Sequence, residues 1–330
     1  MANTNHLLSV RDLVVEYTSD GQVIHAVNGV SFDLEKGKTI GLVGETGAGK
    51  TTIAKSILRI LPDPPARIRG GEIFYQGRDL MKASELEMRS IRGKSISMIF
   101  QDPMTALNPI MRVGSQIAEV IALHEKCSRA EAEKKARTML EMVGIPGSRF
   151  REYPHQFSGG MKQRVVIAMA LACNPELLLA DEPTTALDVT VQAQVLDMIA
   201  ELRRKYGTSM IMITHDLGVV AQVCDTVAVV YAGEVVEYGT REQLFHRPMH
   251  PYTEGLFGSL PDLDSDVERL SPIEGLPPDP SDLPKGCAFN PRCPYATEAC
   301  RAGHVPLQDM GNGHLCRCCN LGKTVEKKEG

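Results

Sequence analysis

The sequence lacks an apolar run long enough to cross a membrane. Its best candidate, Val165–Cys173, has about half of the ~18 to 20 residues that a spanning helix needs. The first eleven residues also lack the basic start, apolar stretch and small-residue cleavage pattern of a secretion signal. We therefore expect a cytoplasmic protein that does not itself cross a bilayer.

An excess of positive charge is also lacking. The 330 residues include 36 Lys and Arg against 41 Asp and Glu, which gives a formal charge of −5. No long basic cluster with interleaved aromatic residues is present, so the sequence shows no electrostatic footprint for nucleic acid. With 43% hydrophobic residues, the chain can bury a substantial core.

The nine cysteines are unevenly distributed. Three are scattered through the chain and are interpreted as small core or surface residues: Cys127, Cys173 and Cys224. The other six crowd into the C-terminal tail. Disulfides are disfavoured in the cytoplasm, so clustered thiols there indicate a metal or iron–sulfur site more often than a covalent scaffold.

Changes in composition divide the chain into four predicted parts. Residues 1–100 combine short β-like runs with a glycine-rich loop, and residues 101–169 are rich in helix-forming residues. Residues 170–247 resume an α/β core through two apolar runs that end in polar residues. Residues 248–330 hold a proline-rich linker and the cysteine-rich accessory segment.

The glycine-rich loop lies between an apolar run, Ile40–Val43, and a segment of helical spacing, Thr51–Leu61. It fits the pattern G-x-x-x-x-G-K-[ST], whose glycines let backbone N–H groups surround phosphate oxygens at a helix N-terminus. Lys50 would reach the terminal phosphates, and Thr51 would offer a hydroxyl to Mg²⁺. The alternative is a glycine-rich turn that fits by chance. The residues expected to bind nucleotide here are Gly44, Glu45, Thr46, Gly47, Ala48, Gly49, Lys50, Thr51 and Thr52.

Two carboxylates follow the apolar run Leu177–Ala180. Asp181 suits the Mg²⁺ shell, and Glu182 suits polarisation of the attacking water as a general base. Taken alone, the pair is also compatible with a helix N-cap and a solvated acid.

A second anion site is predicted where Ser158, Gly159 and Gly160 precede an apolar helix, Val165–Ala172. The alternative reading makes Ser158 an ordinary N-cap.

These motifs together resemble those of the ATP-binding cassette (ABC) ATPases over Leu7–Arg247. The resemblance also rests on Gln101, Leu178–Pro183, Ala186–Asp188 and His215. The closer similarity is to the ATPase subunits of peptide and nickel ABC importers, through Phe157–Met161, His250–Thr253 and the cysteine-bearing tail. It implies an α/β P-loop NTPase core with an antiparallel β subdomain, an inserted helical subdomain and a Cys-rich C-terminal extension.

The resemblance also implies roles for single residues. Two cassettes would face head to tail, each ATP lying between one phosphate loop and the partner's Ser158, Gly159 and Gly160. Gln101 would contact Mg²⁺ and the water, His215 would hold the γ-phosphate, and Asp188 would communicate across the dimer. An aromatic at the end of an early strand, Tyr17, would stack on adenine. The expected catalytic residues are Glu182, His215, Gln101 and Lys50, and the expected Mg²⁺ ligands are Thr51, Gln101 and Asp181.

Four tail cysteines could ligate either an iron–sulfur cluster or tetrahedral zinc. In chain order, five, six and fifteen residues lie between Cys287, Cys293, Cys300 and Cys316. The resemblance implies a [4Fe–4S] cluster, while zinc and free or oxidised thiols stay as alternatives. Cys318 and Cys319 are additional, which leaves the fourth ligand open.

The importer interpretation implies two permease subunits, an extracytoplasmic solute-binding protein and a second, non-identical cassette subunit. The chain would then lie peripherally on the inner face of the cell membrane and energise uptake of di- or oligopeptides, or of a related solute such as a nickel chelate. The alternative is a soluble cassette ATPase that acts on nucleic acid or ribosomes. A small-molecule kinase would share the phosphate loop but has no use for the Ser158–Gly160 motif.

Overall fold

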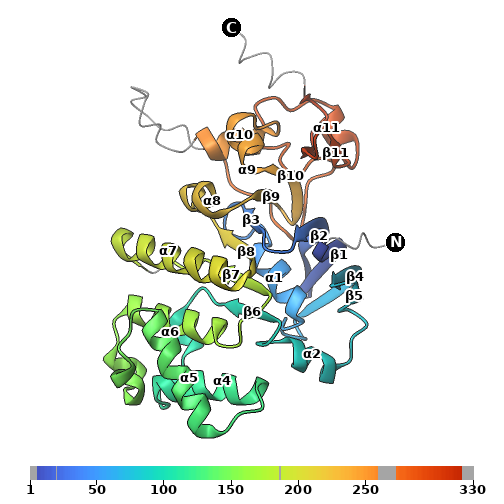
Figure 1. The fold of residues 1–330 in the computed structure, drawn as a ribbon. Helices are drawn as coiled ribbons and strands as arrows, with labels where there is room; N and C mark the ends of the chain where they lie inside the picture. The colour runs from blue at the N-terminus through green and yellow to red at the C-terminus, as the bar shows by residue number, and fades with distance from the viewer. Residues whose placement is uncertain (1–5, 20, 186, 259–272, 322–330) are drawn as a thin grey trace. The chain divides into compact units, whose positions relative to one another are not determined.

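The computed structural model describes residues 6–19, 21–185, 187–258 and 273–321 (Figure 1). The chain forms two units, of which unit 1 comprises residues 1–34, 39–81 and 214–330, and unit 2 comprises residues 35–38 and 82–213. The four-part division made from composition stays a prediction. Within the described part of the chain, no helix combines the length and the apolar character that spanning a membrane requires.

Unit 1 contains a four-stranded sheet of order β2-β1-β4-β5, in which β4 pairs antiparallel with β1 and with β5. Its strands are β1 (His6–Ser19), β2 (Gln22–Glu35), β4 (Ala66–Tyr75) and β5 (Arg78–Asp79). The sequence predicted several short strands before residue 35, whereas the structure has two strands of 14 residues each. The pairing of β1 with β4 continues across register irregularities between Arg11 and Val14 and between Val14 and Val15.

The second sheet of unit 1 has the order β11-β12-β10-β9-β3. Its strands are β3 (Thr39–Val43), β9 (Thr226–Tyr231), β10 (Glu234–Thr240), β11 (Gln308–Asp309) and β12 (Leu315–Cys316). β3 and β9 are far apart in sequence but pair in parallel and lie side by side in Figure 1. All five residues of β3 are buried, as expected of a parallel strand covered on both faces.

The cysteine-rich tail is built into this sheet, because β12 pairs antiparallel with β10 and with β11. The helices of unit 1 are α1 (Lys50–Leu58), α8 (Leu217–Val223), α9 (Arg241–His246), α10 (Pro251–Gly258) and α11 (Ala299–Ala302).

Unit 2 has three parallel strands in the order β8-β7-β6, and they are buried along their whole length. They are β6 (Ile96–Ile99), β7 (Leu177–Asp181) and β8 (Ser209–Thr214). The helices are α2 (Glu85–Ile91), α3 (Pro103–Ala106), α4 (Val113–His124), α5 (Arg129–Met142), α6 (Gly159–Leu171) and α7 (Val189–Tyr206), with 3₁₀ turns η1 (Gly147–Arg151) and η2 (Pro154–Gln156).

Helix α5 shows why the insertion in unit 2 is helical. Ser128 and Glu131 form a capping box at its start, which satisfies two backbone N–H groups that the helix itself leaves unpaired. Its buried residues recur on one face at helical spacing: Ala132, Ala136, Met139 and Leu140. Helix α5 packs against α4.

Candidate functional site

The phosphate loop of unit 1 connects β3 to α1, and its backbone requires glycine. Gly49 adopts a φ of +99°, a region that L side chains rarely occupy. A Cβ atom at Gly44 would collide with the carbonyl oxygen of Val230 in β9. The loop therefore lies against the neighbouring strand with no room for side chains at these points.

Lys50 opens α1 and lies almost buried within this loop. Its ammonium donates hydrogen bonds to the carbonyl oxygens of Gly44, at 2.7 Å, and of Glu45, at 2.9 Å. Gly49 is the N-cap of α1, and no side chain caps this end of the helix. Its N-terminus and the Lys50 charge are thus both directed at the loop, the arrangement that suits phosphate oxygens.

Tyr17 is close to the start of α1, where the sequence analysis placed an adenine-stacking aromatic. Its hydroxyl lies 3.3 Å from the Thr52 hydroxyl, and its ring is half-buried at the end of β1.

Another predicted residue of unit 1, His215, is exposed in the turn between β8 and α8. The next residue, Asp216, caps α8 by accepting hydrogen bonds from the backbone N–H groups of Gly218 and Val219.

In unit 2, the structure brings together two predicted catalytic residues. The Glu182 carboxylate accepts a hydrogen bond from the Gln101 side-chain amide at 2.9 Å, across 81 residues of sequence. Asp181, at the end of β7, is buried with 2% exposure. Glu182 follows the last residue of β7 and adopts a left-handed φ of +45°, which is strained for a residue other than glycine.

Sequence reasoning missed Thr185 in this group. Its hydroxyl donates to the same Glu182 oxygen, Oε2, at 2.9 Å. Two donors from different segments therefore fix the carboxylate, whose remaining lone pairs can accept a proton from water. The only sequence signal was a hydroxyl three residues after the acid.

The Ser158 motif forms the start of α6, as the N-cap alternative predicted. The Ser158 hydroxyl accepts a hydrogen bond from the Met161 backbone N–H at 3.4 Å. At Gly160, a Cβ atom would approach Val191 of α7 to 2.8 Å, so glycine allows close packing there. Asp188 is likewise the N-cap of α7, accepting from the Val191 N–H at 3.0 Å.

We expect Ser158→Ala to lower the free energy of unfolding by about 1 kcal/mol, because the exposed cap of α6 is lost. Chemical denaturation measures this change. The matched control, Ser158→Asn, keeps a capping oxygen and should retain the wild-type stability. Equal losses in the two variants would show that the cap contributes nothing.

The tail cysteines lie in one region of unit 1 but not in the predicted arrangement. The Cys300 sulfur lies 3.3 Å from that of Cys319, which was not among the four expected ligands. Cys316 lies in β12 with Glu237 as its Cα partner. Burial raises the pKa of Cys287 and of Cys318 to about 11.

The predicted metal site is therefore not supported. All nine cysteines are free, and among the residues described no three His, Cys, Asp or Glu side chains are grouped so that they could hold a metal ion. The family resemblance had implied a [4Fe–4S] cluster on Cys287, Cys293, Cys300 and Cys316, with zinc as an alternative. Cys316 lies in β12, opposite Glu237 of β10.

A buried polar cluster anchors the C-terminal region to β10. The Glu237 carboxylate accepts hydrogen bonds from the backbone N–H groups of Met249 and His250, both at 2.8 Å, and lies 2.7 Å from Nε2 of His314. The His250 ring accepts from the Tyr252 N–H through Nδ1. Complete burial lowers the pKa of His250 to about 4, although the Glu237 charge opposes the shift.

We expect the free energy of unfolding of the protein to fall in mild acid because of this cluster. His250 is neutral in the fold, whereas in the unfolded chain it binds a proton below its ordinary pKa of 6.5. The unfolded state therefore gains protons as the pH falls from 6.5 towards 4, and stability falls by about 2 kcal/mol between pH 7 and pH 5.

Denaturation curves of the wild type and of His250→Asn at these two pH values test this expectation. Asn keeps an acceptor near the Tyr252 N–H but does not titrate, so the pH dependence should shrink. The exposed His246, replaced in the same way, should leave it unchanged. An undiminished pH dependence in His250→Asn would contradict the assignment.

Comparisons with known proteins agree with this geometry. The family described as "ABC transporter" matches residues 27–185, and the family described as "Oligopeptide/dipeptide transporter, C-terminal region" matches residues 236–300. The chain is 52% identical to a dipeptide transport ATP-binding protein of Bacillus subtilis, over 94% of each chain. It is 49% identical to an oligopeptide transport ATP-binding protein of Escherichia coli, over 94% of this chain and 92% of that one.

Solved structures show the same cassette fold. A dimeric post-hydrolysis ATP-binding cassette bound to ADP and Pi aligns with a TM-score of 0.64 and 25% identity, over 71% of this chain and 98% of that chain. A part of an ABC transporter complex from Clostridium perfringens aligns with a TM-score of 0.62 and 26% identity, over 74% and 92%. The predicted P-loop NTPase core is confirmed, and the alternative of acting on nucleic acid or ribosomes gains no support. The chain belongs to the family of ATP-binding subunits of oligopeptide and dipeptide ABC transporters.

Proposed function

We propose that the chain is the ATP-hydrolysing subunit of an ABC importer that takes up di- or oligopeptides. The observation that carries this proposal is identity near 50% to dipeptide and oligopeptide transport ATP-binding proteins along nearly the whole chain. The geometry of the phosphate loop and of the fixed Glu182 carboxylate supports the chemistry that such a subunit performs.

The reaction is hydrolysis of ATP to ADP and phosphate. In this proposal the loop N–H groups and the Lys50 ammonium bind the β- and γ-phosphates, and the Tyr17 ring stacks on adenine. Glu182 accepts a proton from the attacking water while Gln101 orients the carboxylate and the water. His215 holds the γ-phosphate.

A magnesium ion fits the donors that this proposal assigns to it. The Thr51 hydroxyl, the Gln101 amide oxygen and the Asp181 carboxylate are oxygen ligands of the kind that Mg²⁺ prefers. The Asp181 carboxylate is buried at the end of β7. When bound, the ion shields the negative charge of the transferred phosphoryl group.

The proposal requires a dimer of cassettes, because Ser158, Gly159 and Gly160 would contact the ATP bound to the partner cassette. Asp188 would link the two ATP sites across the dimer. Binding of ATP closes the dimer and hydrolysis reopens it, which shifts the membrane partners between two conformations.

The proposed partners are two permease subunits, a second, non-identical cassette and an extracytoplasmic solute-binding protein. The chain itself would lie peripherally on the inner face of the membrane.

No step of this proposal passes through the tail cysteines. Iron and zinc analysis of the purified chain separates the three alternatives for these cysteines: a [4Fe–4S] cluster gives about four irons per chain, a zinc site gives one zinc, and free or oxidised thiols give neither.

An affinity pull-down of the tagged chain from gently solubilised native membranes tests the proposed assembly. Mass spectrometry should identify two permeases and a second cassette subunit. Recovery of ribosomal or nucleic-acid-bound proteins without permeases would contradict the importer assignment. The tagged chain carrying Lys50→Ala serves as a control for capture that does not depend on nucleotide.

A further inference from the structure

Glu45, the second residue of the phosphate loop, is held by an arginine from the C-terminal region of unit 1. Arg292 forms a bidentate pair with the Glu45 carboxylate, Nη1 to Oε2 at 2.7 Å and Nη2 to Oε1 at 3.0 Å. The Arg292 side chain is only 5% exposed and that of Glu45 is 29% exposed. Planar two-point pairs of this kind fix orientation as well as charge.

The backbone of Glu45 is held from the same region. Its N–H donates to the hydroxyl oxygen of Tyr252 at 2.9 Å. Tyr252 is fully buried in an aromatic cluster, with ring centroids 4.5 Å from Tyr231 and 5.4 Å from Phe289. A side chain packed in this way has little freedom to move, so its hydroxyl is a fixed acceptor.

Arg292 is itself anchored before it reaches Glu45. Its guanidinium donates to the Tyr231 hydroxyl at 3.3 Å and to the backbone carbonyls of Glu274, at 3.0 Å, and Ile273, at 3.3 Å. The charge is therefore presented to the loop in one orientation, and little side-chain entropy is lost in forming the pair.

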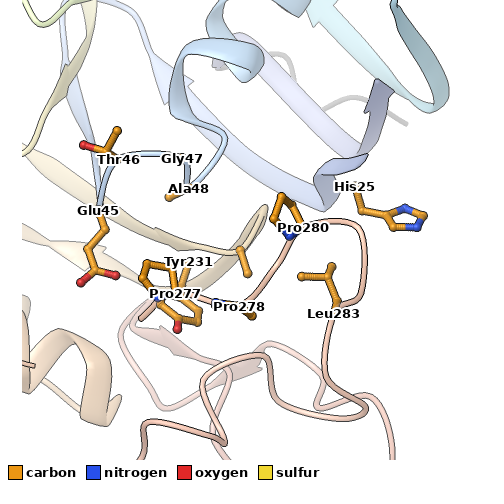
Figure 2. A pocket seen from close by; sticks show the side chains of 11 residues that line it. His25, Glu45, Thr46, Gly47, Ala48, Tyr231, Pro277, Pro278, Pro280 and Leu283 are labelled. Atoms are coloured by element: carbon orange, nitrogen blue, oxygen red, sulfur yellow. The ribbon is translucent and has the colours of Figure 1, made fainter. Parts of the chain in front are cut away.

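The proline-rich segment lies against the same loop. Figure 2 shows Pro277, Pro278, Pro280 and Leu283 around a pocket whose other side is formed by loop residues 45–48. The Pro280 carbonyl accepts a hydrogen bond from the backbone N–H of His25 in β2, at 2.8 Å. The contact between the C-terminal region and the phosphate loop is thus broader than one ion pair.

The backbone N–H, the backbone carbonyl and the side-chain carboxylate of Glu45 each have a partner. The N–H donates to Tyr252, the carboxylate pairs with Arg292, and the carbonyl accepts from Lys50. Lys50 is the cation that the proposed function assigns to the ATP phosphates. A shift of Glu45 would therefore move the carbonyl that positions the Lys50 ammonium.

We propose that Arg292 and Tyr252 are positioning residues for ATP binding: by fixing Glu45, they hold the phosphate loop and Lys50 in the conformation that accepts phosphate. This inference rests on the proposed function, and it makes the C-terminal region part of the ATP-binding machinery. Loss of either contact weakens ATP binding without removing any group that contacts ATP.

The test measures the dissociation constant of a fluorescent ATP analogue with the full chain, together with KM and kcat for ATP. Arg292→Gln and Glu45→Gln should each weaken binding by about tenfold and raise KM more than they lower kcat. The double variant should bind as each single variant does, because both changes remove the same pair. The matched control is Arg301→Gln, an exposed arginine of α11 in the same region, and it should bind ATP normally.

Wild-type affinity in a folded Arg292→Gln variant, or additive losses in the double variant, would overturn the inference. Tyr252→Phe keeps the ring and removes only the acceptor of the Glu45 N–H, so it gives an independent test if Arg292→Gln does not fold. It should weaken binding by about three- to tenfold, and unchanged affinity would overturn the inference. Lys50→Ala separates this result from the proposed function, because normal ATP binding in that variant would contradict the assigned ATP site itself.

Discussion

Replacement of Glu182 by glutamine is expected to leave ATP binding intact and to slow hydrolysis by about 10²- to 10⁴-fold. The Gln carbonyl oxygen can still accept hydrogen bonds from Gln101 and Thr185, which hold the wild-type carboxylate at 2.9 Å each. The amide cannot take a proton from water. The variant therefore loses the general base and keeps the local geometry.

Phosphate release and ATP binding, measured on the same preparation, test this expectation. The variant should also form a long-lived ATP-bound dimer, visible as a larger species in size-exclusion chromatography with ATP. Glu201→Gln, an exposed acid on α7, should hydrolyse ATP at the wild-type rate. Wild-type turnover in Glu182→Gln would remove Glu182 from its proposed role.

Replacement of Lys50 by alanine is expected to weaken ATP binding on the order of 100-fold, which corresponds to ~3 kcal/mol. Lys50 is the cation held inside the phosphate loop by the Gly44 and Glu45 carbonyls, where only 6% of it is exposed. Charge-assisted hydrogen bonds to phosphate in such a site are stronger than those between neutral groups. The rate of hydrolysis at limiting ATP should fall by at least the same factor as the affinity for ATP.

Titration with a fluorescent ATP analogue measures this loss. The control is Lys55→Ala in the next turn of the same helix, whose side chain is partly exposed. It changes the net charge by the same amount without touching the loop. An equal loss of affinity in both variants would show that the effect comes from overall charge and not from the position of Lys50.

The elements that position the phosphate loop could be predicted because their signals are local. The apolar run Ile40–Val43 corresponds to β3, Thr39–Val43. The helix predicted over Thr51–Leu61 is α1, which begins at Lys50 and ends at Leu58. It ends early because Arg59 adopts a left-handed φ of +51° and Pro62 follows, and neither continues a helix.

The pairing of residues from distant segments could not be predicted in this way. Gln101 and Glu182 were both identified by motif, but their direct hydrogen bond depends on how β6 and β7 align in the sheet. The pair of Arg292 and Glu45 spans 247 residues; Glu45 was identified as part of the phosphate loop, but nothing in the sequence marked Arg292 as its partner. Register and tertiary packing decide such contacts, and single-sequence patterns do not carry that information.

The cysteine tail illustrates the same limit. The expected ligand set included Cys316 and left the fourth ligand open, while in the fold Cys316 lies in β12 beside β10 and the Cys319 sulfur lies next to Cys300. A two-residue strand gives no periodic signal, so the sheet role of Cys316 was not visible in the sequence.

In the proposed function, ATP hydrolysis by this chain drives peptide uptake. Uptake of a labelled library of di- to pentapeptides, measured in cells whose only copy of the chain is the wild type or Glu182→Gln, tests it most directly. We expect accumulation of peptide with the wild type and background uptake with the variant, at equal protein levels. Equal peptide accumulation in the two strains would contradict it.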